Sequence, residues 1–481
     1  MTDSPLANPD LLPVPALRRT WHVGSFAALW VSMSACVPTY MLASSLVGGG
    51  MNWWEAVLTI FLGNAIVLVP ILLNAHAGTR YGIPFPVLCR ASFGTVGANL
   101  PALLRAFVAC GWFGIQVWIG GDAIHKILGI FAPSLAVSGT GPLGISLPQF
   151  ACFMVFWAVN MWVVYRGIDS IRILLQIKAP LLITLGIIFL VWAYRSAGGF
   201  GPMLSQPSAF EAGQPRAGQF LSFFIPGLTG MIGFWATLSL NIPDFSRYAA
   251  SQRDQMLGQA LGLPIAMAFF SFIGVAVTSA TVVIFGHSVW DPLEVLVRFR
   301  NPAVLIGAML ALCIATLATN IAANVVSPAN DFAHLAPRRI SFRMGGLITG
   351  VIGILMMPWK LVADPTGYIF TWLVAYSALL GPVGGIMIAD YFVYRHRELD
   401  VAALYDPNGR YRYTNGWSLC AVAAFLLAVL PNLPGFLAQV GLVNPAQIPR
   451  IFAQIYNFAW FGGFAIAFVA YLVFRKLAPK T

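Results

Sequence analysis

Long apolar runs separated by short polar segments dominate the sequence of this chain of 481 residues. Each run has roughly the 20 residues that a helix needs to cross the hydrocarbon core of a bilayer. The pattern therefore predicts an all-α membrane protein with twelve transmembrane helices, which we number 1 to 12. Their approximate ranges are 24–47, 54–75, 99–128, 148–165, 171–194, 220–243, 258–286, 302–325, 344–359, 366–392, 416–431 and 450–474.

Predicted helix 1 is interrupted by polar residues and a proline in the middle of its apolar run. Between Leu29 and Leu46 the interrupting residues are Ser32, Ser34, Cys36, Pro38 and Thr39. Main-chain groups without partners cost roughly several kcal/mol each in hydrocarbon, so a break survives only where it lines a cavity inside the protein. The segment therefore predicts a discontinuous helix that faces a binding site, as in secondary transporters.

Predicted helix 6 contains a second interruption, with Gly227, Gly230 and Gly233 within seven residues. Glycine also allows close helix packing in membranes, but helices 1 and 6 each open a block of five helices. This spacing predicts an inverted repeat. The predicted divisions are 1–23 (N-terminal segment), 24–195 (first repeat, helices 1–5), 196–394 (second repeat, helices 6–10) and 395–481 (helices 11 and 12 with the C-terminal tail).

Composition and charge agree with a multi-pass membrane protein. The chain is 59% hydrophobic and only 9% charged, whereas soluble domains carry about 25% charged residues. Its basic residues fall in short loops and not in one patch with interleaved aromatic residues, which disfavours a nucleic-acid partner. With the N-terminus in the cytoplasm, about 20 basic residues lie inside and about 7 outside, as the positive-inside rule requires. The seven are Lys126, Arg195, Arg216, Arg298, Arg300, Lys360 and Arg450.

The sequence disfavours an enzyme. Its six cysteines and six histidines are dispersed, without the spacing of a metal site. An enzyme within the membrane would need a nucleophile with its base, or a metal cluster, at depth. A channel is a further alternative and would show a filter or pore-lining charges. Charges are nearly absent from the middle of the predicted helices, which favours transport of a neutral or weakly charged solute.

Amides and tryptophans occupy the middle of the predicted helices instead. Trp112 and Gln116 share a face of helix 3, and Asn320 and Asn324 share a face of helix 8. Trp235 follows the glycines of helix 6. Asparagines also join membrane helices to one another, and tryptophans also anchor helices at the membrane interface. Together these residues predict a pocket for a flat ring with amide edges, because indoles stack on rings and amides both donate and accept hydrogen bonds.

Six segments carry a resemblance to a known family. They are NPDLLPVPALRRTW (8–21), CVPTYMLASSL (36–46), WFGIQVWIGG (112–121), ATNIAANVVSPANDF (318–332), MMPWK (356–360) and LLGPVGGIMIADYF (379–392). From about residue 8 to 415 the chain resembles the nucleobase:cation symporter-1 family, and within it is similar to bacterial allantoin permeases and hydantoin transporters. The resemblance implies the leucine-transporter-type fold with five-plus-five inverted repeats, and cation-coupled uptake of purine-related or pyrimidine-related compounds by alternating access.

The resemblance also implies roles for residues of the substrate site. Trp112 and Trp235 hold the ring between them, and Gln116 and Asn324 bind its edge. The break in helix 6 contributes main chain near Gly233 and Phe234, Asn320 belongs to the same site, and Leu373 is a gate. Cys36 stands where the hydantoin transporters carry glutamine, and Phe234 where they carry glycine. The cysteine agrees with an allantoin-type permease.

The implied cation site lies between helices 1 and 8. It uses the main-chain oxygens of Ser32, Ala35 and Ala315 together with the hydroxyl of Thr319. Ala318 stands where sodium-dependent relatives carry a second hydroxyl, which leaves a sodium site one oxygen short unless Ser32 or water supplies it. Sodium and the proton therefore both stay open as the coupling ion, and we expect no other cofactor.

These observations predict a symporter for a neutral cyclic ureide or nucleobase in the inner (plasma) membrane, with both termini in the cytoplasm. Allantoin is the first candidate substrate, and uracil and hydantoin are next. A proton-coupled permease for purines or cytosine is the alternative. The expected partners are the small heterocyclic substrate and the lipid bilayer, with no obligate protein partner.

Overall fold

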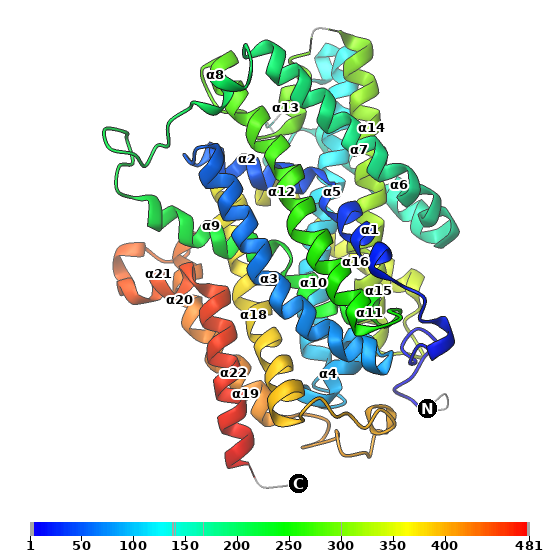
Figure 1. Ribbon diagram of the computed structural model, residues 1–481. Helices are drawn as coiled ribbons and strands as arrows, with labels where there is room; N and C mark the ends of the chain where they lie inside the picture. The colour runs from blue at the N-terminus through cyan, green and yellow to red at the C-terminus, as the bar shows by residue number, and fades with distance from the viewer. Residues whose placement is uncertain (1–3, 137–138, 140, 167, 300, 479–481) are drawn as a thin grey trace.

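The computed structural model of the protein describes residues 4–478, apart from 137–138, 140, 167 and 300. The described residues form a bundle of helices joined by loops (Figure 1). The first and last described residues lie at the same end of the bundle, which we call the terminal face; the opposite end is the distal face.

The helices vary greatly in length. The first half of the chain forms α1 (Val23–Ser34), α2 (Val37–Gly48), α3 (Trp53–Tyr81), α4 (Phe85–Phe93), α5 (Asn99–Phe131), α6 (Leu147–Arg166), α7 (Ile168–Ser196), α8 (Phe200–Leu204), α9 (Phe220–Phe234), α10 (Ala236–Asn241) and α11 (Pro243–Ser246). The second half forms α12 (Gln252–Phe285), α13 (Pro292–Val297), α14 (Pro302–Asn324), α15 (Val326–Leu335), α16 (Phe342–Leu355), α17 (Pro358–Leu361), α18 (Val374–Ile388), α19 (Leu419–Val429), α20 (Leu433–Gln439), α21 (Arg450–Asn457) and α22 (Ala459–Leu477). Two π-helical turns, η3 (Gly367–Leu373) and η4 (Ala389–Tyr394), flank α18.

The lengths and apolar character of these helices fit a membrane protein. Within the described residues, eight continuous helical segments are long and apolar enough to span a bilayer, and the bent pair α1–α2 makes a ninth. The three further predicted runs contain apolar helical stretches at Pro180–Ser196, which is the second part of α7, at Phe220–Phe234 and at Arg343–Leu355. The set is consistent with twelve crossings.

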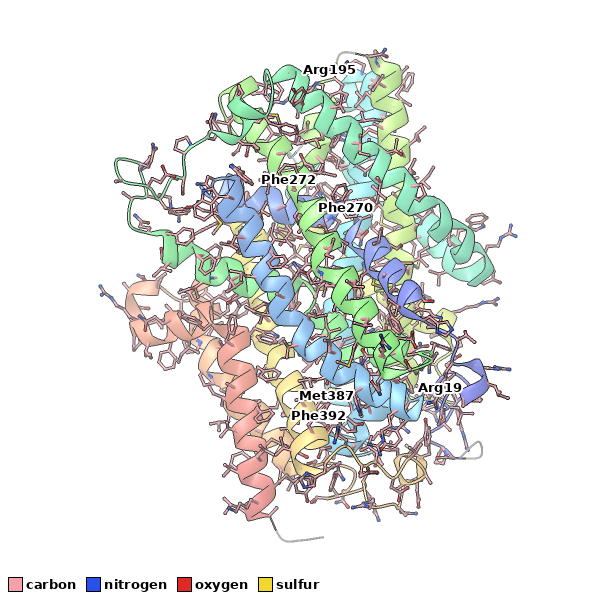
Figure 2. The ribbon with its side chains drawn as sticks, viewed as in Figure 1. Arg19, Arg195, Phe270, Phe272, Met387 and Phe392 are labelled. Carbon is pink, nitrogen blue, oxygen red and sulfur yellow. The ribbon has the colours of Figure 1, made fainter. Side chains whose placement is uncertain are left out.

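Side-chain exposure identifies a surface suited to lipid. On α12, Leu261, Ile265 and Phe269 recur every four residues and are each more than half exposed. Residues four apart share one face of a helix, so this face presents a continuous apolar stripe to its surroundings. Arg19 and Arg195 lie toward opposite ends of the bundle (Figure 2). This arrangement places apolar surface at mid-height and charge near the ends, as a bilayer requires.

The first interruption lies between α1 and α2, whose axes differ by 60°. Ala35 leaves the helical region with ψ 84°, and Cys36 is extended at φ −154° and ψ 157°. Pro38 then occupies the first turn of α2, where its missing N–H costs no hydrogen bond. The break is consistent with the predicted discontinuous helix 1.

The second interruption lies at Trp235, between α9 and α10, where φ is −103° and ψ is 8°. The glycines that precede it serve close packing. A Cβ atom added at Gly233 would lie 2.2 Å from Ser377 Oγ and 2.8 Å from the Leu373 carbonyl oxygen. Gly233 therefore lets α9 approach the junction of η3 and α18, a contact that any side chain would obstruct.

The interrupted helices meet around α5, which packs against α6, α14, α15 and α16. Elsewhere in the bundle, α12 packs along α1, α2 and α3, and α18 packs against α22. A further bend at Val325 separates α14 from α15. The breaks, the bend and η3 therefore bring non-helical main chain into the interior near the middle of α5.

A buried ion pair and an ordered N-terminal segment reinforce the terminal face. Arg105 Nη1 lies 3.3 Å from Asp331 Oδ2, and both side chains are almost fully buried. Residues 4–22 cross this face, where Arg90 donates to the Leu6 carbonyl oxygen at 2.8 Å. Main-chain oxygens of the N-terminal segment thus satisfy buried guanidinium groups, which would otherwise be costly to bury.

Candidate functional site

A cavity of about 40 Å³ lies between the two interrupted helices. Its lining residues are Met33, Cys36, Pro38, Trp112, Gln116, Phe234, Trp235, Thr237, Leu238, Thr319, Ala323 and Asn324. Six of the eight predicted substrate residues are among them; Gly233 and Asn320 are not. The cavity is far smaller than the roughly 300–1,000 Å³ of most ligand pockets. The site is therefore contracted in this conformation.

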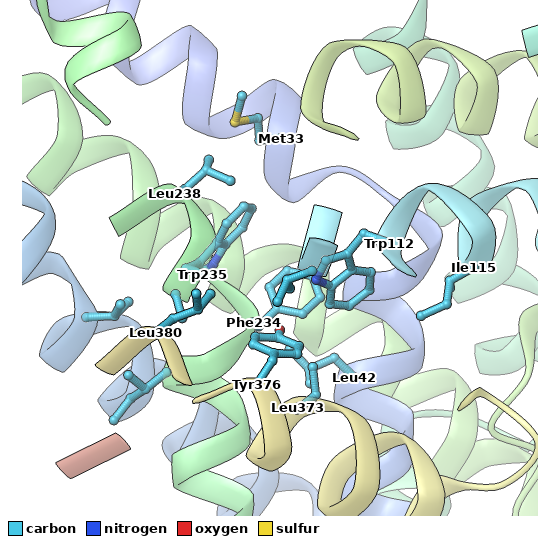
Figure 3. Packing of buried hydrophobic residues seen from close by; sticks show 14 of the residues in the cluster. Met33, Leu42, Trp112, Ile115, Phe234, Trp235, Leu238, Leu373, Tyr376 and Leu380 are labelled. Carbon is cyan, nitrogen blue, oxygen red and sulfur yellow. The ribbon is translucent and has the colours of Figure 1, made fainter. Parts of the chain in front are cut away.

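The phenyl ring of Phe234 lies between the two predicted indoles (Figure 3). Its centroid is 5.2 Å from that of Trp112 and 4.9 Å from that of Trp235, with interplanar angles of 79° and 88°. Trp112 and Trp235 therefore do not face each other directly in this conformation. The cause is local: α9 ends at Phe234, and the break at Trp235 turns two consecutive aromatic side chains inward.

Three aromatic residues from η3 and α18 enclose Trp112 from another direction. The ring centroids of Tyr368, Trp372 and Tyr376 lie 6.2, 5.9 and 6.4 Å from the Trp112 indole. We did not predict these residues. Their spacing of four in the sequence is the signal that could have found them, since residues four apart share a helix face. Figure 3 shows Tyr376 and Leu373 next to each other, below Phe234 and Trp112.

Two polar atoms of lining residues are buried without a hydrogen-bond partner in the described part of the chain. They are Gln116 Oε1, an acceptor, and Trp235 Nε1, a donor. Burying a polar group without a partner costs about 1–3 kcal/mol. A solute that brings a donor to Gln116 and an acceptor to Trp235 would recover that free energy, so the site is suited to a small polar molecule with both groups.

Asn324 lies in the last turn of α14 and connects the cavity to the interior. Its Nδ2 donates to Asn320 Oδ1 at 3.0 Å, and Asn320 Nδ2 donates to Asn160 Oδ1 at 3.1 Å. Asn320 is fully buried and contacts Asn324 and not the cavity. Asn160, on α6, is equally buried and was not predicted. A single amide in an apolar helix gives little indication of which neighbour it binds.

Gly233 of the predicted substrate site and Leu373, the predicted gate, do not line the cavity. Gly233 faces Ser377 and Leu373. Leu373 is fully buried where η3 meets α18, and its side chain lies 3.4 Å from the position of a Cβ atom added at Gly230. Leu373 therefore packs between the glycine face of α9 and the aromatic residues around Trp112.

The five predicted cation-site residues do not all line one cavity. Thr319 lines the cavity described above, and its hydroxyl donates to the Ala315 carbonyl oxygen at 2.9 Å. Ala35 lines a different cavity of about 50 Å³ beside α7. Ser32 and Ala318 line neither. Among the described residues, no three His, Cys, Asp or Glu side chains are grouped so that they could hold a metal ion.

Comparison with known proteins assigns this arrangement to a family. Residues 13–463 match the family described as permease for cytosine/purines, uracil, thiamine, allantoin. The chain belongs to this permease family. The permease is 45% identical over 482 residues to the purine-uracil permease NCS1 of Arabidopsis thaliana, covering 99% of this chain and 79% of that one. It is 40% identical over 478 residues to the allantoin permease of Bacillus subtilis, covering 98% and 94%.

Solved structures show the same fold. The permease superposes on the nucleobase-cation-symport-1 family transporter Mhp1 in a closed conformation with bromovinylhydantoin bound, with a TM-score of 0.77, 24% identity and coverage of 98% and 96%. For inward-facing Mhp1 the TM-score is 0.79, at 25% identity and coverage of 100% and 96%. The predicted family and the leucine-transporter-type fold are thus confirmed, and the protein is a membrane transporter and not an enzyme.

Proposed function

We propose that this permease couples the movement of a cation to the uptake of a neutral cyclic ureide or nucleobase. The proposal is supported by two polar atoms that line the cavity beside aromatic rings and have no hydrogen-bond partner. They are Gln116 Oε1, an acceptor, and Trp235 Nε1, a donor. Uracil, hydantoin and allantoin each carry a urea unit in which a carbonyl group lies between two N–H groups. A carbonyl group suits Trp235, and an N–H group suits Gln116.

Allantoin is the first candidate substrate, with uracil and hydantoin next. Similarity to an allantoin permease and to a purine-uracil permease supports both compound classes. A proton-coupled permease for purines or cytosine is the second candidate, because the family description includes these compounds. Cys36 lines the cavity from the helix 1 break, where it would contact the substrate.

Substrate entry requires the cavity to expand, because ligand pockets usually measure about 300–1,000 Å³. Phe234 occupies the space between the indoles. We infer that it moves aside, with the break at Trp235 acting as a hinge, so that Trp112 and Trp235 can then enclose the ring. Leu373, packed against α9, would act as the gate during this movement.

The orientation that we propose places the terminal face in the cytoplasm and the protein in the inner (plasma) membrane. Arg18 and Arg19 belong to the ordered N-terminal segment at this face, and Arg19 donates to the Arg80 carbonyl oxygen at 3.3 Å. Clusters of basic residues favour the cytoplasmic side of a membrane. In this orientation the distal face opens to the outside, and alternating access would move the substrate from the distal to the terminal face.

For the coupling ion, we propose a site near the helix 1 break that uses main-chain oxygens of Ser32, Ala35 and Ala315 with the Thr319 hydroxyl. Because Ala318 has no side-chain hydroxyl, sodium would be bound weakly, and a proton is the alternative. The variant Ala318→Ser restores a hydroxyl at this position. If the missing oxygen limits sodium coupling, Ala318→Ser gives sodium-stimulated uptake; an unchanged response to sodium contradicts this part of the proposal.

Uptake of labelled allantoin into proteoliposomes under an imposed sodium or proton gradient tests the proposal, with uracil, hydantoin and cytosine as competitors. We expect gradient-driven accumulation that Trp112→Ala and Asn324→Ala abolish without loss of folded protein. Trp118→Ala is the matched control, because Trp118 lies on the same helix but contacts Phe153 and Trp359, away from the cavity. Uptake of none of these compounds, or uptake that never exceeds equilibrium, overturns the proposal.

A further inference from the structure

Three asparagine side chains on two helices form a continuous chain of hydrogen bonds that ends at the cavity. Asn160 on α6 donates to the Phe156 carbonyl oxygen at 2.8 Å. Asn320 on α14 donates to Asn160 Oδ1 at 3.1 Å and to the Phe113 carbonyl oxygen at 3.3 Å. Asn324 then donates to Asn320 Oδ1 at 3.0 Å. Asn160 and Asn320 are fully buried, and Asn324 is 7% exposed where it lines the cavity.

Each amide in this series of hydrogen bonds can adopt only one orientation. A main-chain carbonyl can accept but not donate, so the NH₂ group of Asn160 must face Phe156 and its oxygen must face Asn320. The NH₂ group of Asn320 must likewise face the Phe113 carbonyl and Asn160 Oδ1. A reversed Asn320 amide would place its oxygen against two other oxygens. The oxygen of Asn320 therefore faces Asn324 and fixes the next amide in turn.

The consequence reaches the cavity, because the amide nitrogen of Asn324 is held by Asn320. This bond uses one of the two N–H groups of that nitrogen and thereby fixes the position of the Asn324 oxygen, which a solute in the cavity can then meet. We propose that Asn160 and Asn320 are positioning residues that fix this orientation, so that the permease selects solutes with an N–H donor opposite Asn324. The inference rests on the proposed function, since it concerns the edge of the substrate ring.

A second observation agrees with this selection. Gln116 Oε1 is an unpaired acceptor and Trp235 Nε1 an unpaired donor in the same lining. With Asn324 Oδ1 the cavity presents two acceptors and one donor, which complements two N–H groups and one carbonyl group of a urea unit. Uracil has this unit. Cytosine has nearly the same shape, but one ring nitrogen carries a lone pair in place of the N–H group.

The isosteric pair of uracil and cytosine therefore reports the orientation of the Asn324 amide. Opposite a fixed oxygen, the bare ring nitrogen of cytosine leaves two acceptors facing each other. An amide that is free to rotate can instead turn its NH₂ group toward cytosine. Loss of the positioning residues should thus relax the preference for uracil. If Asn160 and Asn320 served only to join α6 to α14, their substitution would lower expression or stability without changing the preference for uracil.

Inhibition of labelled allantoin uptake by uracil and by cytosine measures this preference; labelled uracil replaces allantoin if allantoin is not taken up. We expect the wild-type permease to bind uracil better than cytosine, and Asn320→Ala to narrow the ratio of the two inhibition constants about tenfold, since an unpaired polar group costs about 1–3 kcal/mol. Asn160→Ala should narrow it less, because the Phe113 carbonyl still holds Asn320. It also serves as the milder variant if Asn320→Ala does not fold.

The matched control is Asn64→Ala. Asn64 on α3 is fully buried and donates to the carbonyl oxygen four residues earlier at 2.7 Å, as Asn160 does, but does not line the cavity. Its substitution should leave the ratio unchanged. A wild-type ratio near one, or an unchanged ratio in both Asn160→Ala and Asn320→Ala, overturns the inference. Absence of uptake of either labelled compound by the wild-type permease refutes the proposed function instead.

Discussion

Residue spacing in the sequence was enough to find much of the cavity lining. Trp112 and Gln116 stand four apart, and both line the cavity with Asn324. The orientation of each side chain could not be predicted, because it depends on neighbours from distant helices. Asn160 becomes part of the site only through the contact of α6 with α14, and Phe234 occupies the space between the indoles only because α9 ends there.

Gln116→Met should separate substrate binding from stability. The buried oxygen of Gln116 has no hydrogen-bond partner, which destabilises the folded protein by about 1–3 kcal/mol. Removing this oxygen should therefore raise the free energy of unfolding. Methionine has nearly the same length and fills the same space. We expect thermal stability in detergent to be unchanged or higher, while the Kd of uracil or allantoin rises about tenfold or more.

The same substitution at Gln259 is the control for this prediction. Gln259 Oε1 is also buried and unpaired, but its amide nitrogen donates to Gln255 on α12, and it does not line the cavity. Gln259→Met should leave substrate affinity unchanged. A fall in affinity for both variants would indicate a general effect of the lost amide and contradict the role of Gln116.

At the scale of elements, the interruptions with a chemical signature were predictable. Proline and small polar residues indicated the break between α1 and α2, and the glycines indicated a special role for α9. The bend at Val325 also has such a residue, because Pro328 has no N–H to donate to the Asn324 carbonyl oxygen four residues earlier. The π-helical turn of η3 has none at its centre. Tyr368 and Trp372 of this turn lie beside Trp112, and π-helical turns often occur at functional sites.

Gly233→Ala should disturb the contact of α9 with the junction of η3 and α18. The added methyl group would lie 2.2 Å from Ser377 Oγ and 2.8 Å from the Leu373 carbonyl oxygen. Since overpacking typically costs about 1–3 kcal/mol, the melting temperature should fall and transport should decrease. Gly227→Ala on the same helix meets only Leu46 at 3.4 Å and should be tolerated. Equal effects of the two substitutions on the melting temperature would contradict the packing role of Gly233.

The short helix α13 on the distal face should respond to pH. Asp291 begins this helix, and its carboxylate accepts from the Leu293 N–H at 2.9 Å. Burial, followed by the nearby carboxylate of Asp122, raises the pKa of Asp291 to about 7 from its ordinary value of 3.8, against the opposing charge of Lys126. A raised pKa means that the folded arrangement binds the proton more tightly, so its stability decreases as pH rises from about 4 to about 7.

Hydrogen–deuterium exchange of the α13 amides measures this effect. After correction for the intrinsic exchange rate, protection should be lower at pH 8 than at pH 5. Asp291→Asn removes the titrating group and should remove the difference. The same difference in the Asn variant would assign the pH response to another group and contradict the role of Asp291.

For the whole molecule, the apolar runs predicted the class of protein, and the helices that are long and apolar enough to cross a membrane overlap those runs. Two of those runs contain shorter helices in the structure, since α9 has 15 residues and α16 has 14. The division into two inverted repeats stays a prediction, because it was inferred from the spacing of the breaks. The terminal face could not be predicted, since residues 4–22 are ordered by main-chain contacts with distant arginines such as Arg90 and Arg247.

Coupling of one monovalent cation to a neutral substrate makes transport electrogenic, and its size can be predicted. One charge crossing 100 mV releases about 2.3 kcal/mol, and each 1.4 kcal/mol corresponds to a tenfold concentration ratio. Proteoliposomes with an inside-negative potential of about 100 mV, set by a potassium gradient and an ionophore, should therefore accumulate the substrate about fortyfold. With equal potassium on both sides and no ion gradient, uptake should stop at equilibrium. A channel would reach equilibrium under both conditions, so accumulation that ignores the potential would contradict coupling to net charge movement.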